Sequence, residues 1–394
     1  MTRFARIFLL IIILLLAVAA LLYVSRESVL KFFFQPTASI LEEGKIGEQA
    51  EREDSEYAAG TDGESPVASA FELIAEKLSI PWEIVFLPDG DLLVTERPGK
   101  LKRIGKDSRI YSIDGVKQVG ESGLLGMALH PGFAENHWLY LYLTTESGGV
   151  LLNRVERYKF INDQLTQRQI IISNIPGAAY HDGGRIAFGP DGYLYITTGD
   201  AGNAELAQDK SSLAGKILRL KDDGSIPAEN PFGNQIFSYG HRNAQGLAWD
   251  NEGRLWATEH GRSGTLSGLD ELNLIEQGKN YGWPLIQGDE TQEGMESPIV
   301  QSGPDETWAP AGMTYWQGSL FFSGLRGESL YRAEIIGPRK VMLKHYFRKE
   351  FGRIRAVVLG PDGFLYISTS NTDGRGTVRP SDDKIIKLDP EKLQ

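Results

Sequence analysis

The chain has 394 residues, enough for a large buried core, and a formal net charge of −11 at pH 7. This acidic balance argues against a nucleic-acid partner, because surfaces that bind nucleic acid collect lysine and arginine. Cysteine is absent, so disulfides, thiolate metal sites and cysteine nucleophiles are excluded. The 45 glycines and the many aromatic residues favour a fold rich in strands and turns.

Residues 1–24 combine two arginines with an uninterrupted apolar run of 17 residues. As a helix this run is about 26 Å long, at the short end of what spans a bilayer. We therefore expect a transmembrane anchor, with the rest of the protein on the extracytoplasmic side, periplasmic or extracellular. The alternative is a secretory signal that is cleaved near Ala19 and releases the protein.

Residues 25–69 are expected to link this segment to the folded part of the chain. The first of them are amphipathic and suited to the membrane interface. Residues 42–65 are acidic and small, and such a segment cannot bury enough apolar surface to fold by itself. We expect a solvated tether.

A repeated unit fills residues 70–394. Each copy has an apolar strand, a turn built on Pro-Asp-Gly or a variant, a second strand and, after a loop, an outer strand. The copies begin at Trp82, Leu124, Arg185, Gln245, Gly312 and Ile354. Outer strands are expected at residues 100–104, 154–160, 216–220, 271–275, 329–335 and 384–388. Four-stranded units of this kind bury their faces by stacking radially, so the sequence predicts an all-β, six-bladed β-propeller.

The third copy opens with a histidine, in the stretch H-D-G-G-R-I-A-F-G-P-D-G-Y-L-Y-I-T-T-G-D. A histidine at the mouth of this hairpin lies at one end of a sheet, where the loops of a propeller converge on a common pocket. His181 is therefore a candidate catalytic residue. The alternative is a turn residue that hydrogen-bonds a neighbour.

Arginines gather in three further motifs. Arg242 and Asn243 lie side by side in G-H-R-N-A-Q-G, a pattern suited to a planar anionic ligand. Arg353 and Arg355 are two residues apart, so on a strand they face the same side. Arg326 is a fourth candidate cation. Together they favour a polyanionic ligand; the alternative is that they are turn and surface residues.

Carboxylates beside glycine-rich backbone occur in T-E-H-G-R, D-E-L-N and N-Y-G-W-P, between residues 258 and 284. Oxygen ligands of this kind suit a hard cation such as Ca²⁺. The sequence has no H-E-x-x-H, P-loop or G-x-S-x-G motif, so zinc proteolysis, nucleotide hydrolysis and standard serine hydrolysis are unsupported.

These motifs, together with G-L-L-G-M-A-L-H-P-G-F and G-R-I-R-A-V-V-L-G-P-D-G-F-L-Y, closely resemble the soluble glucose/sorbosone dehydrogenases. That family consists of aldose sugar dehydrogenases that depend on pyrroloquinoline quinone (PQQ). The likeness runs in order from about Pro81 to Asp389. It implies oxidation of an aldose at the anomeric carbon to the lactone, with electrons passing to PQQ and then to a respiratory quinone or cytochrome.

The resemblance also implies roles for individual residues. His181 matches the family's catalytic base, and Arg242 would stabilise negative charge on the quinone. Contacts to the cofactor are implied for Glu121, Arg242, Asn243, Arg326, Arg353 and Arg355. Two Ca²⁺ sites are implied, one at the cofactor on the backbone carbonyls of Gly261 and Arg262, and a structural one at Glu271 and Tyr281.

Three positions depart from the family pattern. Glu121 stands where a glutamine is common, and Arg262 replaces a proline. Tyr180 precedes the histidine where glucose dehydrogenases have an acid that orients it, so the base needs another orienting group. Two other functions stay open: a Ca²⁺-dependent lactonase, and a non-enzymatic propeller that binds sugar or protein. Neither requires the four arginines.

Overall fold

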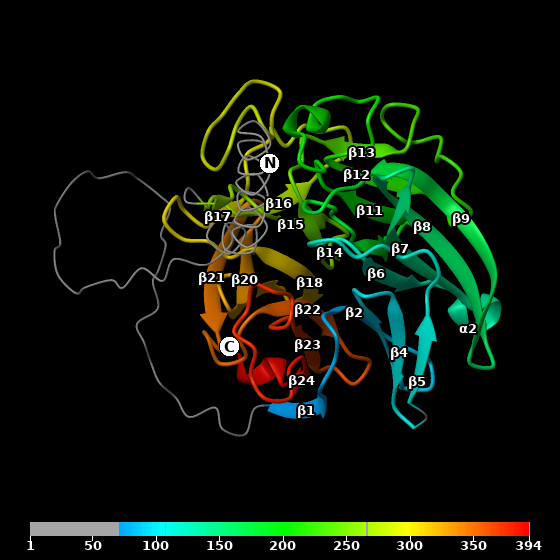
Figure 1. Cartoon of the computed structure of the whole chain (residues 1–394). Helices are drawn as coiled ribbons and strands as arrows, with labels where there is room; N and C mark the ends of the chain where they lie inside the picture. The colour runs from blue at the N-terminus through cyan, green and yellow to red at the C-terminus, as the bar shows by residue number, and fades with distance from the viewer. Residues whose placement is uncertain (1–70, 107, 265–266, 394) are drawn as a thin grey trace, which may run out of the picture. The chain divides into compact units, whose positions relative to one another are not determined.

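The computed structural model describes residues 71–106, 108–264 and 267–393. The strands of the described chain form six four-stranded antiparallel sheets around a common centre, which confirms the predicted six-bladed β-propeller (Figure 1). The predicted anchor and tether, residues 1–24 and 25–69, lie outside the described residues. Among the residues that are described, no helix is long and apolar enough to cross a bilayer.

The first three blades follow one another along the chain, each starting at its innermost strand. The first contains β2 (Pro81–Phe86), β3 (Leu92–Glu96), β4 (Lys100–Ile104) and β5 (Arg109–Ser112). The second contains β6 (Leu124–Leu129), β7 (Trp138–Ser147), β8 (Val150–Ile161) and β9 (Gln164–Pro176). The third contains β10 (Ile186–Phe188), β11 (Leu194–Thr198), β12 (Lys216–Leu220) and β13 (Ile236–Tyr239).

The last three blades keep this order, except that the sixth takes its outermost strand from the beginning of the described chain. The fourth contains β14 (Ala244–Trp249), β15 (Leu255–Glu259), β16 (Glu271–Ile275) and β17 (Val300–Gln301). The fifth contains β18 (Pro310–Trp316), β19 (Ser319–Gly324), β20 (Ser329–Gly337) and β21 (Lys340–Tyr346). The sixth contains β22 (Ile354–Leu359), β23 (Leu365–Thr369), β24 (Ile385–Leu388) and β1 (Phe71–Ala75). The short helices are α2 (Phe133–Asn136), η1 (Ala204–Ala207) and η3 (Pro390–Lys392).

The Pro-Asp-Gly turns join the first and second strands of a blade as the sequence predicts. In the third blade the amide of Gly192 donates to the carbonyl of Gly189 at 2.9 Å, and Gly192 has a φ of 80°. Asp191 accepts from the amide of Tyr193 at 3.2 Å, which fixes the turn from within. Glycine supplies the positive φ and aspartate the local hydrogen bond.

The strands predicted as outer strands are in fact the third strands of their blades, and a further strand lies outside each of them. Strands β5 and β1 have no apolar pattern to reveal them, because neither contains a buried residue. Strand β1 pairs with β24, with Phe71 opposite Leu388. This pairing closes the ring between the two ends of the described chain.

Neighbouring blades pack face to face through apolar side chains. Leu125, Tyr142 and Ile186 belong to one core cluster shared by the second and third blades. Near the centre the backbones approach closely: the amide of Gly126 donates to the carbonyl of Gly184 at 3.0 Å. A Cβ at position 126 would lie 2.1 Å from that oxygen, so this contact requires glycine.

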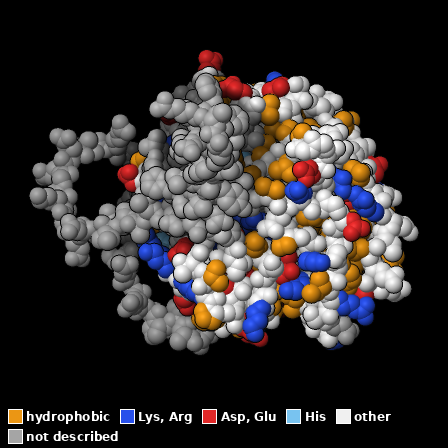
Figure 2. Space-filling view, in the orientation of Figure 1, with side chains coloured by type: hydrophobic (Ala, Val, Ile, Leu, Met, Phe, Trp, Pro, Cys, Tyr) orange, Lys and Arg blue, Asp and Glu red, His pale blue; other side chains and the backbone are white. Residues whose placement is uncertain are grey.

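Acidic and basic side chains are interspersed over the visible face of the propeller (Figure 2). The lysines and arginines in this view lie singly or in small groups beside acidic residues.

Candidate active site

The predicted site residues lie at one end of the propeller, in loops or, as for Glu271 and Arg355, at the start of a strand. The start of an inner strand and the end of its antiparallel neighbour lie at the same edge of a sheet, as the pairing of Ala244 with Glu259 illustrates. Loops that enter the first strand or leave the second strand of each blade therefore converge on the same end. The structure brings His181 and the arginine motifs together here, while the Pro-Asp-Gly turns lie at the other end.

His181 is oriented by an aspartate. Its Nδ1 lies 2.8 Å from Oδ1 of Asp200, whose Oδ2 accepts from Nε1 of Trp283 at 2.9 Å. Burial opposes ionisation of Asp200, but the hydrogen bond from His181 and its charge hold the pKa of Asp200 below its ordinary value. An ionised Asp200 places the imidazole proton on Nδ1 and leaves Nε2 as the ring nitrogen that can accept a proton.

Asp200 is thus the orienting group that the sequence analysis could not name. It follows strand β11, in the T-T-G-D end of the histidine-containing stretch. Asp200 follows the second strand of the blade, and His181 precedes the first, so both lie at the same sheet edge. This placement is the feature of the sequence that could have identified Asp200. The orienting acid lies 19 residues after the histidine in the sequence.

The backbone of His181 has a left-handed conformation with a φ of 60°, which is uncommon for a residue with a side chain. Its amide donates to Oε2 of Glu121 at 3.1 Å, and its carbonyl accepts from the amide of Ala201 at 3.1 Å. Although burial opposes it, the charges of Arg375, His181 and His260 hold the pKa of Glu121 well below its usual range. His181 is therefore held through its main chain as well as its ring.

The neighbouring Asp182 is buried and has a different environment. Its Oδ1 accepts from Nδ2 of Asn153 at 2.9 Å and from the amide of Ala178 at 3.0 Å. Its Oδ2 has no hydrogen-bond partner among the described residues. Burial raises the pKa of Asp182 from an ordinary value of 3.8 to about 7.

We expect Asp182→Asn to remove a pH-dependent loss of stability. An acid whose folded pKa is raised costs stability as the pH rises from the unfolded to the folded value, here from 3.8 to about 7. The full cost at higher pH is at most on the order of 4 kcal/mol. Asparagine keeps a side-chain oxygen that can accept from Nδ2 of Asn153 and from the amide of Ala178. In urea unfolding, the free energy of unfolding of the variant relative to wild type should therefore be higher at pH 8 than at pH 5. An equal difference at the two pH values would contradict this.

Five arginines are buried at this end of the propeller: Arg97, Arg185, Arg242, Arg353 and Arg355. Arg353 contacts Oδ2 of Asp373 through Nε at 3.0 Å and Nη2 at 2.8 Å. Arg355 donates to Oε1 of Gln245 at 2.5 Å. Burial, followed by repulsion from Arg97, lowers the pKa of Arg355 to about 9. The half-buried Arg326 donates to Oγ of Ser267 at 2.6 Å.

Several buried donors here lack partners among the described residues: Nε of Arg97, Nε of Arg355 and Nδ2 of Asn243. The other end of the Asn243 amide is used, because its Oδ1 accepts from the amide of Gly183 at 3.0 Å. Buried donors without acceptors are costly. A flat ligand with carboxylate and carbonyl oxygens would supply the missing acceptors.

Arg242 is held by a buried group of three side chains. His241 lies 2.8 Å from both Oγ of Ser238 and Oε2 of Glu259, and Oε1 of Glu259 accepts from the amide of Arg242. Ser238 and His241 are completely buried, so this arrangement cannot act on a substrate as a hydrolase triad does. It fixes the main chain of Arg242, whose guanidinium lies 5.2 Å from the ring centre of Trp283.

Glu271 lies in a pocket that is also lined by Glu259, Gly261 and Gln287. Burial, followed by repulsion from Glu259, raises the pKa of Glu271 to about 8. Oε1 of Gln287 and Oδ1 of Asn273, whose Nδ2 donates to Glu271, have no donor among the described residues. A hard cation would satisfy this set of oxygens.

The remaining predicted metal residues line the same pocket or adjoin it. The hydroxyl of Tyr281 donates to the carbonyl of Leu274 at 2.6 Å and accepts from the amide of Glu276 at 2.8 Å, so only the main chain of Tyr281 is available to a cation. Gly261 and Arg262 are held through their amides, which donate to Asp270 and Gly268, each at 2.8 Å. In the described part of the chain no three His, Asp or Glu side chains are grouped to hold a metal, so a cation bound here would need backbone and amide oxygens among its ligands.

Sequence analysis missed the acids and cations that complete the site. Arg97, Asp373 and Arg375 follow the second strands of the first and last blades. Only the contact of Arg375 with Glu121 requires the ring to close. Asp373 and Arg353 lie on either side of the β22–β23 hairpin of one blade, and Arg97 is 23 residues from Gly120. Asp373 pairs with Arg353, Arg375 pairs with Glu121, and Arg97 donates to the carbonyl of Gly120.

The chain is similar to known sugar dehydrogenases in sequence and in fold. Residues 78–379 match the model of the glucose/sorbosone dehydrogenase family. The chain is 40% identical to the PQQ-bound aldose sugar dehydrogenase of Streptomyces coelicolor, covering 81% of this chain and 97% of that one, with a TM-score of 0.75. It is 31% identical over 348 residues to an Escherichia coli aldose sugar dehydrogenase, covering 79% of this chain and 92% of that protein. It is 33% identical over 261 residues to the quinoprotein glucose dehydrogenase B of Acinetobacter calcoaceticus, covering 57% and 54%. The chain belongs to the glucose/sorbosone dehydrogenase family.

Proposed function

We propose that this protein is a PQQ-dependent dehydrogenase that oxidises an aldose at its anomeric carbon to the lactone. The observation that carries the proposal is the pairing of His181 with Asp200 at the same end of the propeller as a set of buried arginines. The dyad offers a proton acceptor, and the arginines offer binding energy for a polyanion. Its relatives include a PQQ-bound aldose sugar dehydrogenase.

The residues present fit PQQ, a flat molecule with carboxylates and an ortho-quinone. Arg353 and Arg355 would hold carboxylates, and Arg242 and Asn243 would hold the quinone edge. Arg326 and Glu121 would border the cofactor. The unpartnered donors of Arg355, Arg97 and Asn243 are what such a ligand would satisfy. When bound, PQQ supplies a two-electron acceptor for the hydride of the sugar.

His181 would remove the proton of the anomeric hydroxyl through Nε2, because Nδ1 is committed to Asp200. Asp200 fixes the ring and stabilises the imidazolium that forms. Trp283 in turn fixes Asp200 through its indole N–H. The Arg242 guanidinium would stabilise negative charge where it develops at the quinone edge.

Ca²⁺ would occupy two places. At the cofactor, the backbone carbonyls of Gly261 and Arg262 would hold a cation that adds positive charge near Arg242. At Glu271, a structural cation would also take the main-chain oxygen of Tyr281 and the amide oxygens of Asn273 and Gln287. This cation would compensate for the two buried carboxylates, Glu259 and Glu271, that lie close together.

The test is titration of the metal-free and cofactor-free protein with PQQ and Ca²⁺, followed by assay on a panel of aldoses with an artificial electron acceptor. We expect turnover that requires both PQQ and Ca²⁺. Lactone hydrolysis with Ca²⁺ alone would identify the lactonase instead. Sugar binding without turnover in the PQQ-loaded protein would identify a binding propeller. The physiological acceptor would be a respiratory quinone or cytochrome.

Tyr180 is expected to contact the sugar. Its ring is 40% exposed, stands edge-on to the His181 ring at 4.8 Å and rests against Gly202, where a Cβ would lie 2.9 Å from it. Aromatic contacts contribute about 0.5–1.5 kcal/mol, so Tyr180→Ala should raise KM for aldoses up to about tenfold. PQQ affinity should not change, and Tyr180→Phe should behave like wild type. Tyr193→Ala, at the opposite end of the blade, is the control. An unchanged KM in Tyr180→Ala contradicts this role.

We also propose that residues 1–24 keep the propeller at the outer face of a membrane, near respiratory acceptors. Fractionation of cells expressing the full chain should recover it with membranes, released by detergent but not by salt. A soluble exported form that begins after about Ala19 would establish the cleaved signal instead. Full-length protein in the cytosol would contradict both.

A further inference from the structure

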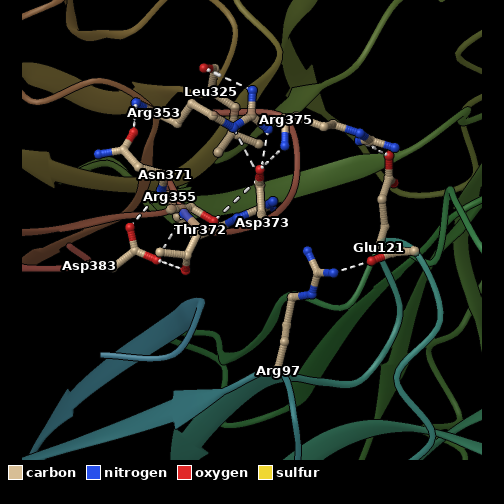
Figure 3. A network of polar contacts seen from close by, with 12 residues as sticks. Arg97, Glu121, Leu325, Arg353, Arg355, Asn371, Thr372, Asp373, Arg375 and Asp383 are labelled. Atoms are coloured by element: carbon tan, nitrogen blue, oxygen red, sulfur yellow. Dashed lines mark hydrogen bonds and ion pairs between the residues drawn. The ribbon is translucent and has the colours of Figure 1, made fainter. Parts of the chain in front are cut away.

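One chain of polar contacts joins the proposed base to the proposed cofactor-binding arginine. The amide of His181 donates to Oε2 of Glu121 at 3.1 Å, and Oε1 of Glu121 lies 2.5 Å from Nη1 of Arg375. The amide of Arg375 donates to Oδ1 of Asp373 at 2.9 Å, and Oδ2 of Asp373 binds Arg353. Figure 3 shows Glu121 and Arg375 reaching toward each other across the site. The contacts link the second, third and sixth blades.

Both ends of the Glu121–Arg375 pair are anchored. The amide of Glu121 donates to the carbonyl of Ala179 at 2.8 Å, which places the segment just before His181 against it. A Cβ at Gly120 would lie 2.1 Å from that same carbonyl, so the two segments are in tight contact. Arg97 holds the segment from the other side by donating to the carbonyl of Gly120. The carboxylate of Glu121 therefore starts from a fixed main chain.

The loop that carries Arg375 is equally well held. The side chain of Asp383 accepts from the amide of Asn371 at 2.6 Å and from the hydroxyl of Thr372 at 2.5 Å. Asn371 in turn accepts from the amide of Arg353 at 2.8 Å (Figure 3). With side-chain exposures of 15% and 30%, Glu121 and Arg375 are shielded enough for their charge-assisted bond to be stronger than a surface pair.

We propose that Glu121 and Arg375 act as a positioning pair that clamps the main chain of His181 in its left-handed conformation and so sets the placement of the base. Such a conformation costs on the order of 1–3 kcal/mol and persists only where surrounding contacts impose it. A glutamine at position 121 can accept from the His181 amide but cannot pair with the Arg375 guanidinium. The carboxylate therefore acts together with Arg375. The expected effect on catalysis rests on the proposed function. The expected effect on the main chain of His181 does not.

The test is a double-mutant cycle with Glu121→Gln, Arg375→Gln and the double variant in the full-length chain. Arg379→Gln is the matched control, because Arg379 is on the same loop but donates to the carbonyls of Lys349 and Glu350 instead. Hydrogen exchange of peptides covering residues 178–184 is measured without PQQ or added Ca²⁺. The rate at which sugar reduces the bound quinone is measured by stopped flow on the PQQ-loaded protein. PQQ affinity is measured by titrating the cofactor-free protein.

We expect both single variants to speed exchange of the His181 segment and to lower the limiting rate of quinone reduction by about tenfold, equivalent to about 1.4 kcal/mol. The double variant should be no worse than the poorer single one, because both remove the same contact. The rate is compared at saturating PQQ, so that a change in cofactor affinity does not affect it, and the control should match wild type. Multiplicative effects in the double variant, or unchanged exchange in the single ones, overturn the proposal. If wild type reduces no quinone while the exchange results hold, the proposed function fails and the clamp stands.

Discussion

Replacing His181 with glutamine is expected to leave PQQ binding intact and to slow oxidation of the sugar by about 10²–10⁴-fold, the usual contribution of a general base. The buried arginines do not depend on the imidazole, so cofactor affinity should stay close to wild type. Glutamine can still donate to Asp200 and so keeps the local contact. It cannot accept the hydroxyl proton, and hydride departure from an undissociated hydroxyl is unfavourable.

The loss should fall on one half of the catalytic cycle. In stopped-flow experiments, sugar added to the oxidised PQQ-loaded variant should bleach the quinone slowly. Reoxidation of chemically reduced cofactor by an acceptor should change much less, because no proton is taken from sugar in that step. A variant that reduces its quinone at the wild-type rate would show that His181 is only a turn residue.

Asp200→Asn provides a companion measurement. Asparagine keeps the size of the side chain but presents an amide that need not accept from Nδ1 of His181, so the ring can adopt the tautomer with the proton on Nε2. The same reaction step should slow while PQQ affinity stays unchanged. This pattern would separate orientation of the base from binding of the cofactor.

The architecture could be predicted from sequence because the repeat is carried by buried strands and by turns with specific chemistry. The copies beginning at Arg185 and Ile354 both contain Pro-Asp-Gly between two apolar runs, and both form the expected hairpins. The outermost strands could not be predicted in this way. Strand β1 has no buried side chain, so neither its pattern nor its position identifies β24 as its partner.

Site residues could be predicted from the sequence only where a single motif contains the residue and indicates its chemistry. His181 and Arg242 could be singled out because each lies in a motif with its own chemistry. Asp200 and His181 are 19 residues apart, and their contact depends on the pairing of strands β10 and β11. Arg375 and Glu121 are 254 residues apart and meet only because the last blade closes beside the first ones. Electrostatic partners brought together by ring closure leave no local pattern in the sequence.

The arginine pair should account for most of the cofactor affinity, and the structure makes the two members unequal. Charge-assisted bonds to carboxylates contribute about 1.5–3 kcal/mol each, so Arg353→Ala with Arg355→Ala should weaken PQQ binding at least about a hundredfold. The single variants should differ, because Arg355 leaves behind the neutral Gln245 whereas Arg353 leaves behind Asp373, a carboxylate with a side chain only 2% exposed. Without Arg353, that buried charge would repel the cofactor's carboxylates as well as losing its own partner.

Arg353→Ala should therefore bind PQQ more weakly than Arg355→Ala, and adding Asp373→Asn should recover part of the loss. Adding Asp373→Asn to Arg355→Ala should recover no affinity. In that variant Asp373 is still paired with Arg353, so the substitution removes a partner of Arg353 and not an unpaired charge. Titration calorimetry with PQQ in excess Ca²⁺ measures each affinity, and Arg339→Ala, at an arginine that is 47% exposed on the surface, controls for loss of positive charge. Circular dichroism checks that each variant keeps its strands. Equal losses in the two single variants, with no recovery from Asp373→Asn, would mean that the Asp373 charge has no part in cofactor binding. Unchanged PQQ affinity in the double arginine variant would remove the main reason for preferring a quinone enzyme to a lactonase or a binding propeller.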